Sequence, residues 1–113
     1  MEKGKSRRQE KIEELLRHVT SSFIGEVSGV NSLITVTRTS VSKDLKKATV
    51  YITVIPEKEE KRALEFVKRK GSELRHRAKK QLSTRTLPFF EFEIDYGERN
   101  RQRIDELSRK AKD

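Results

Sequence analysis

The first regularly spaced apolar residues predict a helix near the N-terminus. Polar residues separate them at the three- and four-residue spacing of one buried helical stripe. The stripe consists of Ile12, Leu15, Leu16, Val19, Phe23, Ile24 and Val27. Ser6 and Gln9 precede it at the spacing of a capping box, in which two side chains cover free N–H groups of the first turn. Gly25 and Gly29 indicate that the helix ends in that region.

An alternating, β-branched pattern follows and predicts two strands. In the first, Leu33 to Val41, the apolar positions change parity before Val41, which predicts a bulge or break near Arg38–Ser40. After a polar connection, the second strand runs from Ala48 to Ile55. Pro56 ends this strand because proline has no N–H group for the ladder.

Residues 57–82 predict a helix that is interrupted once. One apolar face includes Val67 and another includes Leu74, and Gly71 and Ser72 lie between them. Glycine can end a helix in a left-handed conformation, and serine can cap the next helix. We therefore predict a helix–kink–helix. A single helix with a costly internal glycine is the alternative.

The last part of the chain predicts a third strand and a polar helix. Pro88 opens the strand, which runs from Phe89 to Asp95 with its acids on one face. Tyr96-Gly97 predicts a turn, and a short helix follows from Glu98 to about Lys110. Three strands need a covered face to be stable. The apolar helical stripes can cover one face, so we predict a two-layer α+β domain with a three-stranded sheet.

Composition narrows the class of protein. Of the 113 residues, 32% are hydrophobic and 40% are charged, which by itself resembles a disordered chain. Disorder is rejected because both charge signs are interspersed and the apolar residues follow helical and strand periods. The absence of cysteine excludes disulfides, thiolate zinc sites and a cysteine nucleophile. No apolar run has the length of a membrane span or secretory signal, so we expect a cytoplasmic protein without a membrane partner.

The net charge of +9 is unevenly distributed. Residues 68–80 hold seven cations and one acid, whereas residues 89–98 hold four acids and no base. Residues 1–11 and 38–47 each carry +3. This segregation favours a phosphate-binding surface, and a helix that starts near Gly71 would add free N–H groups. The alternative is a solvated charged surface.

The residues that could carry catalysis are isolated. His18 and His76 each lack a second ligand at helical spacing, so we expect no metal site and no cofactor. Glu91, Glu93 and Asp95 share a strand face; the solvent side of a sheet is the preferred interpretation, and a small acid–base enzyme remains an alternative. Aromatic residues are too scarce to support a base-stacking platform, so contacts to the RNA backbone are favoured.

Several segments resemble the bacterial ribosome-binding factor A family. The most specific is Val41-Ser42-Lys43-Asp44-Leu45-Lys46-Lys47-Ala48-Thr49-Val50-Tyr51. Gly71-Ser72-Glu73-Leu74-Arg75, Leu87-Pro88 and the strand end at Phe92 to Asp95 are looser matches. The resemblance implies a type II KH-like domain over residues 6–97, preceded by a flexible basic segment at 1–5 and followed by a short polar helix or tail at 98–113. This chain has Arg69 where the family has alanine before the kink.

The resemblance also implies a function. Family members bind the free small (30S) ribosomal subunit and 16S rRNA and assist late 16S rRNA maturation, including the 5′ end. They are associated with growth in the cold and have no catalytic activity of their own. We therefore expect a monomeric assembly factor without a small-molecule substrate. A general KH-like RNA-binding module, or a protein-interaction module that uses the sheet edge or acidic third strand, is the alternative.

The predicted RNA contacts follow from the charge distribution. We expect the main contacts around the kink and auxiliary ones at the chain start and interstrand connection. Ser42 and Asp44 are expected to shape that connection through local hydrogen bonds. The predicted RNA-binding residues are Lys68, Arg69, Lys70, Gly71, Arg75, Arg77, Lys79, Lys80, Lys43, Lys46, Lys47, Arg7 and Arg8.

Overall fold

The computed structural model describes residues 5–28, 33–82 and 87–112, which contain four α-helices and three strands. In chain order the elements are α1 (Arg7–Val27), β1 (Leu33–Val41), β2 (Lys47–Ile55), the 3₁₀ turn η1 (Glu57–Glu59), α2 (Glu60–Arg69), α3 (Gly71–Gln81), β3 (Phe89–Ile94) and α4 (Tyr96–Lys112). The predicted strands and helices are confirmed. Gly29 and residues 1–4 of the predicted flexible segment lie outside the described residues.

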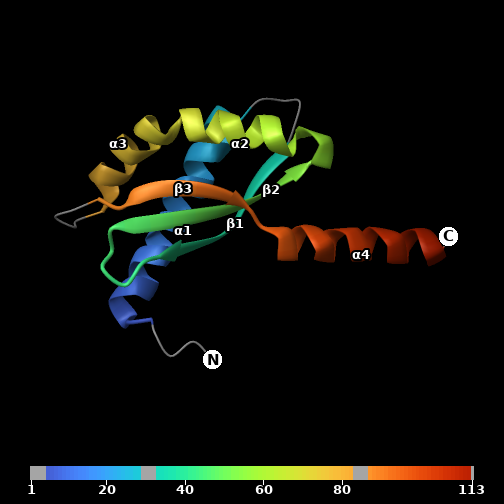
Figure 1. Ribbon diagram of the computed structural model, residues 1–113, viewed down its shortest axis with the longest axis horizontal. Coiled ribbons are helices and arrows are strands. Elements are labelled where there is room, and N and C mark those ends of the chain that lie inside the picture. Colours follow the sequence, from blue (N-terminus) through green and yellow to red (C-terminus); the bar gives the residue numbers. More distant parts are fainter. Residues whose placement is uncertain (1–4, 29–32, 83–86, 113) are drawn as a thin grey trace.

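The strands form one mixed sheet in the order β1-β2-β3. β1 and β2 are antiparallel, whereas β3 runs parallel to β2, because α2 and α3 carry the chain back along the sheet. Figure 1 shows α1 crossing behind the sheet and α2 and α3 following its upper side, while α4 points away from the other elements. The predicted two-layer α+β arrangement is thus confirmed, and α4 extends from it as an arm.

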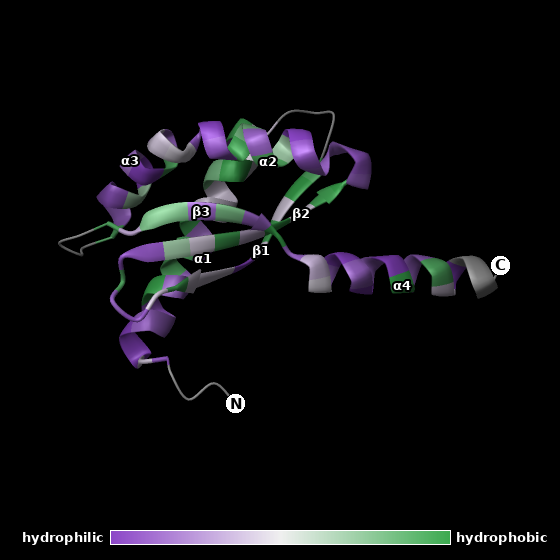
Figure 2. Ribbon diagram, viewed as in Figure 1, coloured by the Kyte–Doolittle hydropathy of each residue, from purple (hydrophilic) through white to green (hydrophobic). Residues whose placement is uncertain are grey.

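The hydrophobic core lies between the sheet and the first three helices. Val50 and Ile52 of β2, Leu16 of α1 and Leu74 of α3 are all fully buried. Burial of such side chains stabilises a fold by about 1.5–3 kcal/mol each. Figure 2 shows hydrophobic residues along the strands and mainly hydrophilic residues along α3 and α4. The charged surface is therefore carried by helices that contribute few residues to the core.

The start of α1 is capped as predicted, and it also covers part of the free edge of β1. Ser6 Oγ accepts the N–H of Gln9 at 3.1 Å, and Gln9 Oε1 accepts the N–H of Ser6 at 2.9 Å. Gln9 Nε2 donates to the carbonyl of Val41 at 3.0 Å, and the N–H of Val41 donates to the Glu13 carboxylate at 2.8 Å. An unpaired strand edge can recruit another strand, and α1 blocks that at Val41.

A bulge in β1 accounts for the change of parity. The pairing with β2 steps from Val36 directly to Arg38, so Thr37 has no partner in the register. The irregularity was predicted near Arg38–Ser40 and lies one residue earlier. Thr37 Oγ1 donates a hydrogen bond to the carboxylate of Asp95 at 2.6 Å.

The kink between α2 and α3 lies where the sequence predicts it, but its origin differs. Lys70 separates the helices with φ −88° and ψ 3°, a conformation open to most residue types. Gly71 is the first residue of α3 and does not have a positive φ. Ser72 lies inside α3 and is not its cap residue. The predicted left-handed glycine and serine cap are therefore wrong, because backbone geometry at Lys70 already makes the break.

Helix α4 begins directly after β3. The carboxylate of Asp95 accepts the N–H of Glu98 at 3.1 Å, which is N-cap geometry. The predicted turn at Tyr96-Gly97 is therefore wrong: these residues form the first turn of the helix. Arg99 lies 2.7 Å from Glu60 and ties this turn to the start of α2.

Candidate nucleic-acid interface

The kink between α2 and α3 presents cations that no acid neutralises. Lys68 and Arg69 are exposed, and neither has a partner among the described residues. Lys70 is less free: its Nζ lies 3.5 Å from a Glu73 carboxylate oxygen and 5.7 Å from the centre of the Phe66 ring. An unpaired cation can bind phosphate without first breaking an ion pair. Lys68 and Arg69 are therefore the most available of the predicted contacts at the kink.

Helix α3 contains both free and paired cations. Lys79 and Lys80 are exposed and have no hydrogen-bond or ion-pair partner in the described part of the chain. Arg77 is ion-paired with Glu26 of α1, and its guanidinium lies over the Phe23 ring, 5.3 Å from the ring centre. Arg77 thus connects α3 to α1, whereas the two lysines remain available to a ligand.

A hollow of about 450 Å³ lies beside the first turns of α3. Its lining residues come from α1 and α3 and include more cations than acids; they are Phe23, Ser72, Glu73, His76, Arg77 and Lys80. Among the residues that the structure describes, no side chain makes a capping hydrogen bond at the start of α3. The first N–H groups of this helix can therefore attract an anion together with the surrounding cations.

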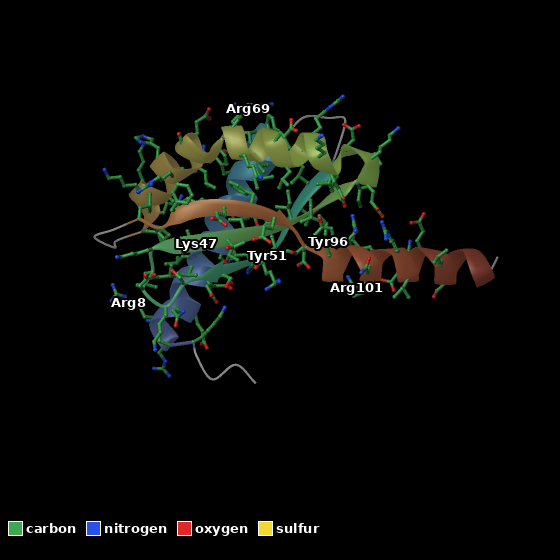
Figure 3. All side chains as sticks on the ribbon, in the orientation of Figure 1. Arg8, Lys47, Tyr51, Arg69, Tyr96 and Arg101 are labelled. Atoms are coloured by element: carbon green, nitrogen blue, oxygen red, sulfur yellow. The ribbon has the colours of Figure 1, made fainter. Side chains whose placement is uncertain are left out.

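The auxiliary residues lie at another part of the molecule. They are exposed residues of the α1 start, of the β1–β2 connection and of the first position of β2, namely Arg7, Arg8, Lys43, Lys46 and Lys47. The hydrogen bond from Gln9 to Val41 joins these two segments. Lys47 is the least free, since its Nζ lies 3.2 Å from Glu91. In Figure 3, Arg69 lies at the upper edge of the molecule, and Lys47 and Arg8 lie at the left and lower left.

The two groups approach each other near the start of β3. Arg75 Nη2 of α3 lies 3.5 Å from the carbonyl oxygen of Leu87. Two residues further on, the N–H of Phe89 donates to the carbonyl of Lys46 at 2.8 Å. The predicted residues thus form two groups, one along the kink and α3 and one at the α1 start and connection, on either side of the segment that leads into β3.

Local hydrogen bonds shape the β1–β2 connection, as predicted. Ser42 Oγ donates to the Asp44 carboxylate at 2.7 Å, and the same carboxylate accepts the N–H of Lys46 at 3.1 Å. These two bonds, the one from Ser42 foremost, lower the pKa of Asp44. Leu45 adopts a positive φ of 62° between them. The connection therefore holds Lys43 and Lys46 on a structured turn.

The role of Asp95 was missed by the sequence analysis. The residue is 9% exposed, and its carboxylate accepts hydrogen bonds from Thr37 and from the N–H of Glu98 and lies 3.5 Å from Arg38 Nε. Burial alone would raise the pKa of Asp95, but these partners outweigh burial and lower it. The signal was present: an acid that ends a strand, followed three residues later by glutamate, is an N-cap pattern.

Residues 5–28, 33–82 and 87–112 hold neither a candidate metal cluster nor a candidate membrane span. These residues contain no group of three or more histidine or acidic side chains that could hold a metal ion. None of their helices is long and apolar enough to cross a membrane. His18 and His76 are both exposed, and His18 Nε2 lies 3.2 Å from Glu14.

Fold and kink together define a class of protein. The order α-β-β-α-α-β, with β2 parallel to β3 and two helices that meet at a kink, is that of a type II KH-like domain. The comparison with protein families then identifies the group within this class. A family model described as ribosome-binding factor A matches residues 8–108, and the chain belongs to that family.

Individual relatives agree with the family match. The ribosome-binding factor A of Macrococcus caseolyticus is 37% identical over 115 residues, covering 92% of this chain and 97% of that protein. The crystal structure of ribosome-binding factor A from Thermus thermophilus matches with a TM-score of 0.67 and 25% identity, covering 76% and 94% of the two chains.

A second Thermus thermophilus structure shows the same fold. It is a homology model of ribosome binding factor A as fitted into a cryo-EM map of a 30S–RbfA complex. It matches with a TM-score of 0.62 and 24% identity, covering 80% of this chain and 93% of that one.

Proposed function

We propose that this protein binds the free small (30S) ribosomal subunit through 16S rRNA and acts as an assembly factor. Family membership supports the ribosomal partner, as does the fitted complex of a protein with the same fold. One observation carries the RNA contact: α2 and α3 present exposed cations that have no partner within the described residues. We call these the helical cations; they are Lys68, Arg69, Lys79 and Lys80.

The finer parts of the proposal come from the family resemblance. The bound protein assists late maturation of 16S rRNA, including processing of its 5′ end, and it contributes to growth in the cold. It acts in the cytoplasm as a monomer and performs no catalysis of its own. Its contribution is to hold RNA in one arrangement while other factors act on it.

The physical basis is the release of counterions from the RNA backbone. Each cation that contacts a phosphate displaces a condensed counterion, so affinity falls as salt rises. The uncapped start of α3 adds N–H groups, and Gly71 leaves space because a Cβ there would meet nothing within 4 Å. A phosphate can therefore approach the backbone beside Lys70, next to Lys68 and Arg69.

Co-sedimentation with purified small subunits over a range of salt concentrations tests this proposal. The variant Lys68→Glu/Arg69→Glu should lose at least tenfold in affinity, and its slope of log affinity against log salt should decrease by about 1.4, the value for two phosphate contacts. The matched control is Lys61→Glu/Arg62→Glu. These residues are exposed on the same helix, two turns before the kink, and undergo the same change of charge.

Three outcomes would each contradict a different part of the proposal. An unchanged slope in the kink variant removes this surface from the mechanism. An equal loss in the control shows that overall charge, not the kink, governs binding. Equal affinity for small subunits and for an unrelated RNA of similar length favours the alternative of a general RNA-binding module.

A further inference from the structure

The face of the sheet opposite the core is left uncovered by α1, α2 and α3. Figure 3 shows Lys47 and Tyr51 on the near side of the sheet, whereas α1 lies behind it. The register places Arg38, Tyr51 and Glu93 in one row across the three strands. Further along, Lys47 of β2 pairs with Phe89 of β3. We call this surface, from Thr35 to Phe89, the open face.

The centre of the open face is rigid before any partner binds. The guanidinium of Arg38 lies over the ring of Tyr51, 3.8 Å from the ring centre. Asp95, which is buried, lies 3.5 Å from Arg38 Nε and is itself held by Thr37 of the bulge. A side chain held in place in this way loses little conformational entropy on binding.

The charges of the open face argue against RNA as its ligand. Arg38 and Lys47 are matched by acids on β3, since Lys47 pairs with Glu91 and Glu93 stands in the same row as Arg38. Residues 89–98 contain four acids and no base. A phosphate that approached Arg38 would therefore meet the Asp95 carboxylate, which lies 3.5 Å from Arg38 Nε, and opposing like charges are costly.

The residue types of the open face instead fit a protein partner. Tyrosine, arginine and phenylalanine are enriched at the centres of protein interfaces. Tyr51 and Arg38 occupy the centre, and Phe89, 61% exposed, lies at one end. Leu33 and Ile55 form an exposed apolar pair at the other end. A partner with cations opposite β3 and apolar side chains at both ends would match this pattern.

We propose that the open face binds a basic protein surface that places lysine or arginine against Glu93, while RNA occupies the helical cations. This inference rests on the proposed function, because the partner is expected on the small subunit. Three strands of this length present about 400 Å², about half of what each partner buries in a standard interface. The contact is therefore a weak one that adds to the RNA contact.

Photo-crosslinking on purified small subunits separates the two faces. The full chain carries a benzophenone amino acid either at Thr35, exposed on the open face, or at Gln81, exposed at the end of α3. Co-sedimentation first shows that each probe variant binds, and thermal melting shows that it folds. We expect the probe at Thr35 to crosslink to a basic ribosomal protein and the probe at Gln81 to crosslink to RNA.

A charge reversal then tests the acids. Glu93→Lys should reduce the protein crosslink from Thr35 about tenfold or more, because the new lysine faces the partner's cations. Glu65→Lys, an exposed site on α2 with the same change of charge, should leave it unchanged.

Each result of the crosslinking decides one of the two proposals. A crosslink from Thr35 to RNA, or none while the chain still co-sediments, overturns the inference and leaves the proposed function standing. An unchanged protein crosslink in Glu93→Lys also overturns the inference. Failure of the unmodified chain to co-sediment overturns the proposed function, and with it the partner on the subunit.

Discussion

The helical surface and the open face of the sheet differ in how their charges are arranged. On α2 and α3 the charges are mostly of one sign, and Lys68 and Arg69 have no partner in the described residues. On the open face each cation is paired, Lys47 with Glu91 and Arg38 with Asp95. Unpaired charge of one sign favours a polyanion, whereas paired charge around aromatic and apolar residues favours a protein. The two faces of one small domain therefore suit different partners.

The strongest test of this comparison removes the residue that makes the open face rigid. Asp95→Ala should lower the free energy of unfolding by about 2–3 kcal/mol. The change removes the cap of α4, worth about 1 kcal/mol. It also removes the charged acceptor of the half-buried Thr37 hydroxyl, which keeps only the carbonyl of Tyr51 at 3.3 Å, and this loss costs about 1–2 kcal/mol more. Urea unfolding followed by circular dichroism measures the change.

The control for Asp95 is its neighbour on the same strand. Glu93→Ala alters an exposed acid without a partner in the described residues and should change stability by less than about 0.5 kcal/mol. Similar losses in both variants would show that Asp95 does not organise this face.

The same residue predicts a dependence on pH. Because the pKa of Asp95 is lowered in the folded protein, the ionised form adds stability above the unfolded pKa of about 3.9 and loses it as pH falls through the folded pKa. The stability difference between the native chain and Asp95→Ala should thus be constant from neutral pH to about pH 5 and shrink below about pH 4. Unfolding curves across this range measure it. A difference that grows on acidification would contradict the lowered pKa.

Local patterns were sufficient to predict the secondary structure but not the long-range pairs. The capping box at Ser6 and the break near Gly71 follow from residues close together in sequence, so the elements were predictable. The ion pair of Arg77 with Glu26 spans 51 residues and depends on how α3 packs on α1. Charge counting treated Arg77 as equal to Lys80, and only the packing separates them.

The difference between the ion-paired Arg77 and the free lysines of α3 leads to a prediction whose expected effect is of intermediate size. Lys79→Gln/Lys80→Gln should reduce affinity for small subunits about tenfold at physiological salt, the effect of two lost phosphate contacts. Arg77→Gln should reduce it less than about twofold, because Glu26 already neutralises that guanidinium. Salt-dependent co-sedimentation measures the affinity of the native chain and of both variants.

A change of the acid in this ion pair, instead of the arginine, tests the same distinction from the other side. Glu26→Gln releases Arg77 and should raise affinity about threefold, the gain from one additional phosphate contact at physiological salt. Arg77→Gln could instead weaken binding as strongly as the variant that changes both lysines. That result would show that the ion pair opens in the complex, and the distinction between free and paired cations would fail.

The smallest expected effect concerns Gly71, where stability and binding should change in opposite directions. Gly71 has an ordinary helical conformation at the start of α3, and a Cβ there would meet nothing within 4 Å. Gly71→Ala should therefore raise the free energy of unfolding by about 0.5 kcal/mol, since alanine restricts the unfolded chain. Affinity for small subunits should fall about threefold if a phosphate lies against this backbone, as proposed. Ser72→Ala, one position later, is the matched control and should leave affinity unchanged. Gly71→Ala with increased stability and full affinity would show that the helical cations bind RNA through their side chains alone.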